Sequence, residues 1–309
     1  MTNRALLTAI ALGLAAVVLM LAPVRLGLFG AFLSTFSLVP LFAAVLTLGP
    51  RLGALSAAVA VLALAAFAGI QGALVTASLT LLPAIAIGHL VGLSRDEGDG
   101  LEWYPLSNVL FGIGIIAAVT MVLYGLVMGF EQDAFRTQVG TAIDRMANDG
   151  ALPPALEAAD RSRLATLFAQ WMPVLMPFSL VLMLSGSLYL GDRLARALGP
   201  VDRPRADLPA EIALPQVAFV GFVVFALLST FDGTLGLVAR LFLGAFAALF
   251  AMVGLATVHF LTRGNPARGF ILWAMYLGAL LFSFSILVFI ALGIAETLLG
   301  LRARRAART

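Results

Sequence analysis

Long apolar stretches, separated by short segments that carry nearly all the charges, constrain this sequence more than any other feature. They cover roughly residues 5–22, 26–48, 52–70, 73–91, 106–130, 167–190, 217–231, 241–261 and 270–299. Most approach or exceed the length of about 20 residues that a helix needs to cross a hydrocarbon core. Backbone polar groups inside lipid must be satisfied within the protein, so helices are expected. The sequence therefore predicts an all-α fold, a polytopic transmembrane bundle of about 8–10 passes.

Composition supports a single integral membrane domain over residues 1–309. Hydrophobic residues make up 61% of the chain and charged residues 11%, against about 25% charged residues in soluble domains. We expect N-terminal helices (1–130), an amphipathic surface segment (131–164), C-terminal helices (165–301) and a basic tail (302–309). Cysteine is absent, which excludes disulfides and thiolate metal sites. The net charge of +3 indicates membrane topology and not nucleic-acid binding.

Arginine placement predicts which loops face the cytoplasm. With Arg4 inside, alternate loops place Arg51, Arg95, the arginines of 193–205 and those of 263–268 inside as well. The tail 302–305 should join them, yet a ninth single crossing would put it outside. Residues 269–301 could form two short membrane passes with a hinge at 283–285. Alternatively, they form one long tilted helix, and the number of crossings assigned to the rest of the chain is wrong. We favour a cytoplasmic tail and leave the crossing number open.

The segment 131–163 predicts an amphipathic hairpin at the membrane surface. The residues 148–150 should end its first helix, and Pro153-Pro154 can start a second. Such a hairpin would either lid a cavity or simply cover the end of the bundle. Its apolar residues recur at helical spacing: Phe135, Val139, Ile143 and Met146.

Small residues mark where helices can approach closely in lipid. The residues 53–60 contain a short strip of this kind. A second set, in the first helix, follows a four-residue spacing and is a candidate docking face for a partner helix, although ordinary internal packing would use the same spacing. That set consists of Ala5, Ala9, Ala11 and Ala15.

Few polar residues within the apolar stretches could contact a ligand. We single out His89, Asn108 and His259 as candidate pocket-wall residues, each with a structural alternative at the membrane interface. No His or acidic pair has metal-ligand spacing, and no catalytic or phosphate-binding motif is present. We therefore expect no enzyme activity, no metal and no cofactor.

Glu296 is the only acid inside a long apolar stretch. A charge placed there is costly unless it is paired. Arg302, six residues later, is the predicted partner, and such an ion pair would fix the tail. A proton-coupling role for Glu296 is the alternative.

Two family resemblances rest on short motifs. Pro40 and the sequence Gly49-Pro50-Arg51-Leu52-Gly53, followed by an Ala/Gly-rich helix, resemble the early helices of the substrate-binding S components of energy-coupling factor (ECF) vitamin transporters. The alanine spacing of the first helix also resembles the face that such proteins present to a transmembrane partner. The whole layout resembles the YybS-like family of bacterial membrane proteins, in its Gly-Pro hairpin, its long loop after residue 130 and its ending 293–296 followed by Arg302.

The resemblance implies a bacterial inner-membrane protein that binds an unidentified small molecule and works with a separate transmembrane/ATPase energising complex. The lipid bilayer is its other expected partner, and no nucleic acid is expected. The alternative is a non-transporting scaffold in cell-envelope or morphogenetic assembly. A polar-lined cavity that reaches the midplane of the membrane would favour the first interpretation, and tightly packed helices without a cavity would favour the second.

Overall fold

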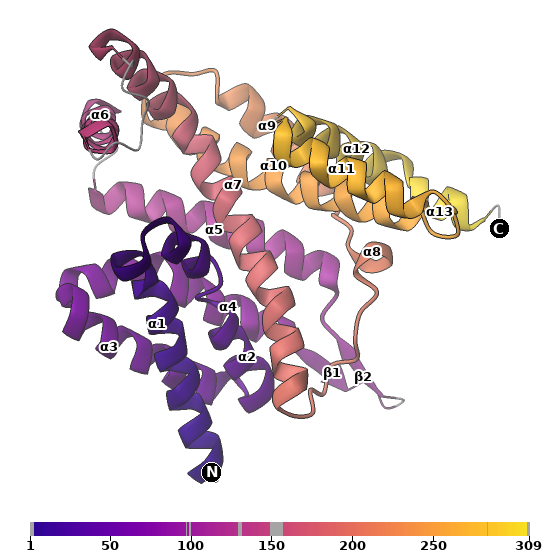
Figure 1. Ribbon diagram of the computed structural model, residues 1–309. Helices are drawn as coiled ribbons and strands as arrows, with labels where there is room; N and C mark the ends of the chain where they lie inside the picture. Colours follow the sequence, from indigo (N-terminus) through magenta and orange to yellow (C-terminus); the bar gives the residue numbers. More distant parts are fainter. Residues whose placement is uncertain are drawn as a thin grey trace.

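The computed structural model describes residues 3–307 except 97, 99, 129–131, 149–156 and 283, and it confirms the all-α prediction (Figure 1). Five helical stretches are long and apolar enough to cross a membrane, and four shorter apolar helices accompany them. The long stretches are Asn3–Ser34, Pro50–Val91, Leu106–Val127, Ala159–Leu198 and Gly233–Leu261. The protein is therefore a polytopic membrane protein.

The first part of the chain consists of helices and one small hairpin of strands. The helices are α1 (Asn3–Ser34), α2 (Val39–Leu48), α3 (Pro50–Thr76), the π-helix η1 (Ala77–Leu81), α4 (Leu82–Val91) and α5 (Leu106–Met128). Strands β1 (Ser94–Asp96) and β2 (Leu101–Trp103) pair antiparallel between α4 and α5.

Helices make up the rest of the described chain. They are α6 (Gln132–Asn148), α7 (Ala158–Leu198), α8 (Leu208–Glu211), α9 (Gln216–Leu228), α10 (Gly233–Leu261), α11 (Arg268–Leu281), α12 (Ser285–Leu299) and α13 (Leu301–Ala306).

The apolar stretch 26–48 is broken into pieces, where its composition predicts one continuous helix. Helix α1 kinks at Gly27, whose φ of 53° is accessible to glycine. The chain then folds back so closely that a Cβ at Gly30 would collide with the carbonyl of Ala22. A turn over residues 35–38 leads into α2, which is only 10 residues long. Because of Gly27 and Gly30, this stretch forms a reversal of the chain followed by the short, buried helix α2, and not one continuous helix.

The stretches 52–70 and 73–91 form a helical hairpin, as their separation predicts. The break lies at Gly69, which has a φ of 78°. Near the two ends of the hairpin, Gly53 and Gly88 both lie against Val45 of α2. The chain must therefore reverse direction between them, and α2 fills the open end of the hairpin.

Helix α10 is the central element of the bundle. It packs against α5, α7, α9 and α12, and most of its membrane-spanning window is buried. A Cβ at Gly254 would collide with the carbonyl of Phe289 on α12, and a Cβ at Gly293 with the carbonyl of Phe250 on α10. The two glycines therefore let the backbones of α10 and α12 touch.

The C-terminal apolar stretch consists of two helices, α11 and α12, and a single long tilted helix is excluded. The chain leaves helical geometry at Phe282, one residue before the predicted hinge at 283–285, of which residue 283 lies outside the described residues. The Ser285 hydroxyl donates a hydrogen bond to the carbonyl of Gly278 at 3.0 Å across this hinge. The two helices lie side by side in Figure 1.

The predicted surface hairpin is confirmed in its first helix, and its second helix is longer than predicted because it continues into the next membrane-spanning stretch. Helix α6 packs against α7, with Ile143 buried and Asp144 3.8 Å from Arg161. The second arm is the beginning of α7 itself, which spans 41 residues, or about 60 Å at about 1.5 Å per residue. It therefore runs without interruption from outside the hydrocarbon core into it. The predicted start at 153–154 and the Phe135 side chain lie outside the described residues.

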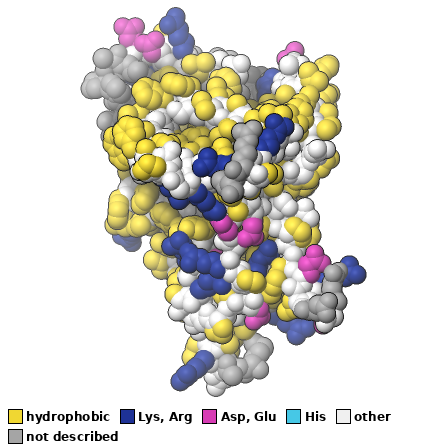
Figure 2. Space-filling view, turned by 90° about the vertical axis from the view of Figure 1, so that its right-hand side faces the viewer, with side chains coloured by type: hydrophobic (Ala, Val, Ile, Leu, Met, Phe, Trp, Pro, Cys, Tyr) yellow, Lys and Arg dark blue, Asp and Glu magenta, His cyan; other side chains and the backbone are white. Residues whose placement is uncertain are grey.

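One end of the bundle gathers the segments for which we predict a cytoplasmic position. Arg203 donates hydrogen bonds to the carbonyls of Val91 and Tyr104 at 2.9 and 2.8 Å. Arg305 donates one to the carbonyl of Arg263 at 3.3 Å. The loops after α4, α7 and α10 and the tail thus meet at one end. Figure 2 views the molecule from the right of Figure 1 and shows dark blue arginine side chains across the middle of that face.

Because these loops meet at one end, we predict that this end, with α13, is cytoplasmic and that α6 is external. The chain has no cysteine, so single introduced cysteines can test this orientation directly. Ala142→Cys on α6 and Ala303→Cys on α13 are both exposed positions. We expect a membrane-impermeant maleimide to label Ala142→Cys in intact cells, and Ala303→Cys only after permeabilisation. Labelling of Ala303→Cys in intact cells would contradict the predicted orientation.

Because α10 and α12 approach closely at Gly254, we predict that a single added methyl group there lowers the stability of the folded protein. Gly254→Ala should destabilise the protein by about 1–3 kcal/mol, as overpacking typically does. Gly186→Ala is the matched control, because a Cβ there meets no atom within 4 Å. Thermal unfolding in detergent measures both, and equal midpoints would refute the close crossing.

Candidate functional site

A groove of about 600 Å³ lies between α5 and the second arm of the α3–α4 hairpin, which follows the break at Gly69. Its walls are mostly aliphatic, and η1 forms part of one wall. π-Helical turns are rare and often mark functional sites. The lining residues are Leu74, Val75, Ala77, Ser78, Leu82, Pro83, Ala86, Ile116, Thr120, Leu123, Tyr124 and Val127.

The groove opens sideways from the bundle. Leu74, Leu82 and Leu123 on its rim are more than half exposed, and Val127 is 80% exposed. All four belong to stretches that are long and apolar enough to cross a membrane, so we expect this opening to face lipid and not water. On α5 the lining residues occupy the half that is remote from the arginine-rich end.

Two hydroxyl groups distinguish the α5 wall. Thr120 and Tyr124 lie one helical turn apart and both line the groove. Neither side chain has a hydrogen-bond partner among the residues that the structure describes. On the opposite wall, by contrast, the Ser78 hydroxyl donates to the carbonyl of Val75 at 2.9 Å. Polar groups facing lipid are costly when they remain unsatisfied, so a ligand with a hydrogen-bonding group would find partners here.

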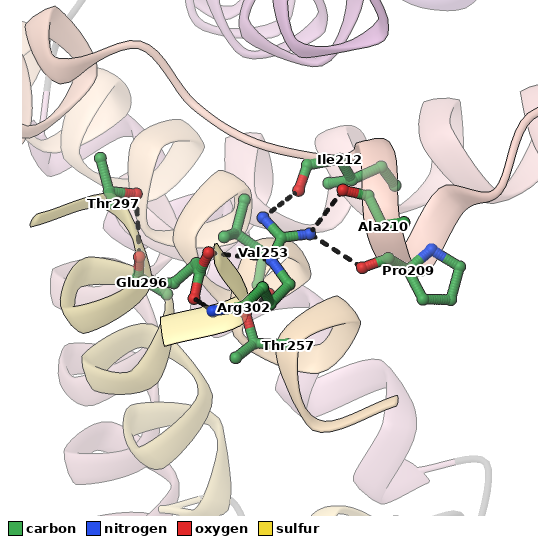
Figure 3. Close-up of polar contacts among 9 residues, drawn as sticks. Pro209, Ala210, Ile212, Val253, Thr257, Glu296, Thr297 and Arg302 are labelled. Carbon is green, nitrogen blue, oxygen red and sulfur yellow. Dashed lines mark hydrogen bonds and ion pairs between the residues drawn. The ribbon is translucent and has the colours of Figure 1, made fainter. Parts of the chain in front are cut away.

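A second polar cluster is buried at the arginine-rich end, where Glu296 and Arg302 form the predicted ion pair. Arg302 Nε lies 2.9 Å from Glu296 Oε1, and the Arg302 backbone N–H donates to Glu296 Oε2 at 3.1 Å. Both side chains are less than one-tenth exposed. The guanidinium also donates to the carbonyls of Pro209, Ala210 and Ile212 (Figure 3).

This cluster, which we term the Arg302 anchor, connects three parts of the chain. Glu296 is on α12, Arg302 on α13, and the carbonyls 209–212 belong to the linker between α7 and α9. The carboxylate and carbonyl oxygens accept hydrogen bonds from the Arg302 guanidinium, so the cluster has a structural role and holds these three parts together. The carboxylate is engaged, which argues against Glu296 as a proton carrier.

A second arginine ties the same linker to the loop before α11. Arg263 donates two hydrogen bonds to the Asp207 carboxylate, at 2.7 and 2.5 Å. These bonds lower the pKa of Asp207 from its ordinary value. Because the folded pKa is depressed, the contact stabilises the fold at neutral pH, and the stabilisation is lost as the pH falls through that lowered pKa. The pair is exposed, so its contribution is small.

The three predicted pocket-wall residues do not come together. His89 is exposed near the end of α4, and Asn108 is half-buried in the first turn of α5. His259 Nε2 lies 2.7 Å from the Tyr276 hydroxyl, which links α10 to α11. None of the three lines the groove. Sequence reasoning missed Thr120 and Tyr124, although two polar residues four apart on an apolar helix were an available signal.

The four alanines of the predicted docking face lie on different sides of α1. Ala9 is fully buried, and its carbonyl accepts a hydrogen bond from the Ser56 hydroxyl of α3 at 2.7 Å. Ala5 is half-buried, whereas Ala11 and Ala15 are exposed. Ala9 therefore belongs to the contact between α1 and α3, and only Ala11 and Ala15 remain accessible to a partner. Docking itself stays a prediction.

A comparison with protein families covers most of the chain. The model of a family described as "Predicted membrane protein (DUF2232)" matches residues 14–297. The chain belongs to this family. The DUF2232 description states membrane location and names no ligand or partner, so the YybS-like and S-component resemblances remain expectations. No curated protein and no solved structure matches the chain.

The Arg302 anchor predicts a large effect of a single neutral substitution. Arg302→Gln leaves the Glu296 carboxylate buried without its cation, a change that typically costs about 3–5 kcal/mol. Arg51→Gln, at an exposed position in the first turn of α3, is the control and should have little effect. Unfolding in mixed micelles and proteolysis of the linker 203–215 measure both, and equal behaviour of the two variants would contradict a structural role.

Proposed function

We propose that this DUF2232 protein binds an amphipathic small molecule, which enters the groove between η1–α4 and α5 from the bilayer. The observation that carries the proposal is a pair of hydroxyls, Thr120 and Tyr124, which find no hydrogen-bond partner in the described part of the chain and line an apolar groove at the side of the bundle. The aliphatic wall suits a hydrocarbon chain. The hydroxyls suit a single polar group such as a hydroxyl, carbonyl or ether oxygen.

Broken helices next to the groove support a binding role. The α3–α4 hairpin contains the π-helix η1, and α2 is a short half-helix whose residues are largely buried. In membrane transporters, discontinuous helices often form the binding site. The first half of this chain therefore has the irregular architecture expected of a site, and α10 provides a tightly packed frame behind it.

We further propose that the protein is the binding subunit of a bacterial inner-membrane transport system, with a separate energising complex. The chain has no phosphate-binding motif of the G-x-x-x-x-G-K-[ST] type. Its one acid within a long apolar stretch, Glu296, is held by Arg302. Energy would therefore come from a partner, for which the exposed residues Ala11 and Ala15 of α1 offer a small-residue contact. The rival is a scaffold role, which needs a partner but no ligand.

The proposal predicts that filling the groove removes a bound molecule. The full chain is purified in nanodiscs formed directly from native membranes, and extracted small molecules are identified by mass spectrometry. Ala86→Trp places a large ring in the groove, and Ala58→Trp makes the same change at an exposed position of α3 outside it. We expect an amphipathic compound with the wild type and Ala58→Trp, but not with Ala86→Trp.

A second pair of variants tests the hydroxyls. Tyr124→Phe combined with Thr120→Val keeps the shape of the groove and should weaken binding of the identified compound by about 2- to 10-fold per hydrogen bond lost. Tyr189→Phe on α7 is the control. If all variants carry the same small molecules as the wild type, the groove is not a binding site and the scaffold interpretation gains.

A further inference from the structure

Beside the Arg302 anchor, α13 carries two further arginines. Helix α13 continues the chain directly after α12, and the buried Arg302 side chain fixes it against the linker 209–212. Arg304 and Arg305 are exposed. The hydrogen bond from Arg305 to the Arg263 carbonyl holds the tail beside the loop that leads into α11. Arg268 begins α11 at the other side of this loop.

The nearby carboxylates are already engaged. Asp207 accepts two hydrogen bonds from Arg263, and Glu296 accepts from Arg302. Among the residues that the structure describes, no carboxylate pairs with Arg268, Arg304 or Arg305. A fixed corner of the bundle therefore carries three cations that pair with no acid of the described chain.

We propose that Arg268, Arg304 and Arg305 bind the phosphate headgroup of an anionic phospholipid. Guanidinium groups bind phosphate oxygens in a bidentate manner, and basic pockets at the cytoplasmic ends of membrane helices attract anionic lipids. The Arg302 anchor makes the site preorganised, because α13 cannot swing away with its arginines.

The surface next to these arginines points to a lipid and not to a free anion. Two and five residues after Arg268, within the first two turns of α11, the side chains of Phe270 and Trp273 are 70% and 61% exposed. Aromatic side chains of this kind settle at the level of the headgroups. A phospholipid could therefore place its phosphate among the arginines and its acyl chains along the apolar surface of α11. This site is independent of the groove, which lies in the opposite half of the bundle.

The test uses the full chain in nanodiscs of phosphatidylcholine with a minor fraction of phosphatidylglycerol. Native mass spectrometry counts the phosphatidylglycerol that remains bound when the disc is removed. Replacement of Arg268, Arg304 and Arg305 by Gln should lower this retention by at least about tenfold. Replacement by Lys, which keeps the charge but not the fork of donors, should retain an intermediate amount.

A matched control makes the same charge change at the other end of the protein, with Arg25→Gln, Arg145→Gln and Arg163→Gln. It should retain as much phosphatidylglycerol as the wild type. Equal loss in both Gln triples would overturn the proposal, since net charge alone would then explain retention. Displacement of the lipid by added inorganic phosphate would overturn it as well, because the site would then select an anion and not a lipid.

Discussion

The hydrophobic effect does not drive one helix against another in lipid, because lipid tails are as apolar as the helix surfaces. The architecture of this chain therefore depends on other interactions between its helices. Helices in a bilayer associate through close packing and internal hydrogen bonds. Here Gly254 and Gly293 bring the backbones of α10 and α12 into contact. Between α1 and α3 an internal hydrogen bond serves instead, because the Ser56 hydroxyl donates to the carbonyl of Ala9. Apolar side chains such as Leu62 and Val220 can then remain exposed to lipid at no cost.

Polar interactions are concentrated where this packing ends. At the arginine-rich end, Arg203 holds the loops around α4 and α5, and Arg263 and Arg302 hold the linker that follows. Backbone carbonyls supply many of the acceptors, so the loops are fixed by a small number of guanidinium groups. The two halves of the bundle also pack against each other through α5, α7 and α10, so the arginine-mediated hydrogen bonds add a second connection between them at this end.

The sequence predicted those features that depend on local composition. Apolar length predicted the helices, the two serines at positions 283 and 285 marked the break between α11 and α12, and the isolated acid Glu296 predicted its partner Arg302. Helical geometry alone also separates Ala9 from Ala11, since residues two apart lie on opposite faces of a helix. The predicted single docking face was incompatible with that geometry.

Other features depend on backbone conformation or on tertiary contact, and sequence could not supply them. The sequence is apolar on both sides of Gly27, so its composition does not show whether the helix continues through this glycine or folds back there. A π-helix has no composition of its own. The groove unites residues 74–86 with residues 116–127, and only packing brings these segments together. His89, Asn108 and His259 were selected for polarity alone, and packing distributes them over three helices.

Solvation of the exposed apolar faces by lipid is the central claim, and collision accessibility measures it most directly. Single cysteines replace Leu62, Val220 and Val288, which are more than half exposed on α3, α9 and α12, and carry a spin label in nanodiscs. The account predicts frequent collisions with lipid-soluble oxygen and few with a water-soluble nickel chelate. Frequent collisions with the chelate at these three positions would contradict it.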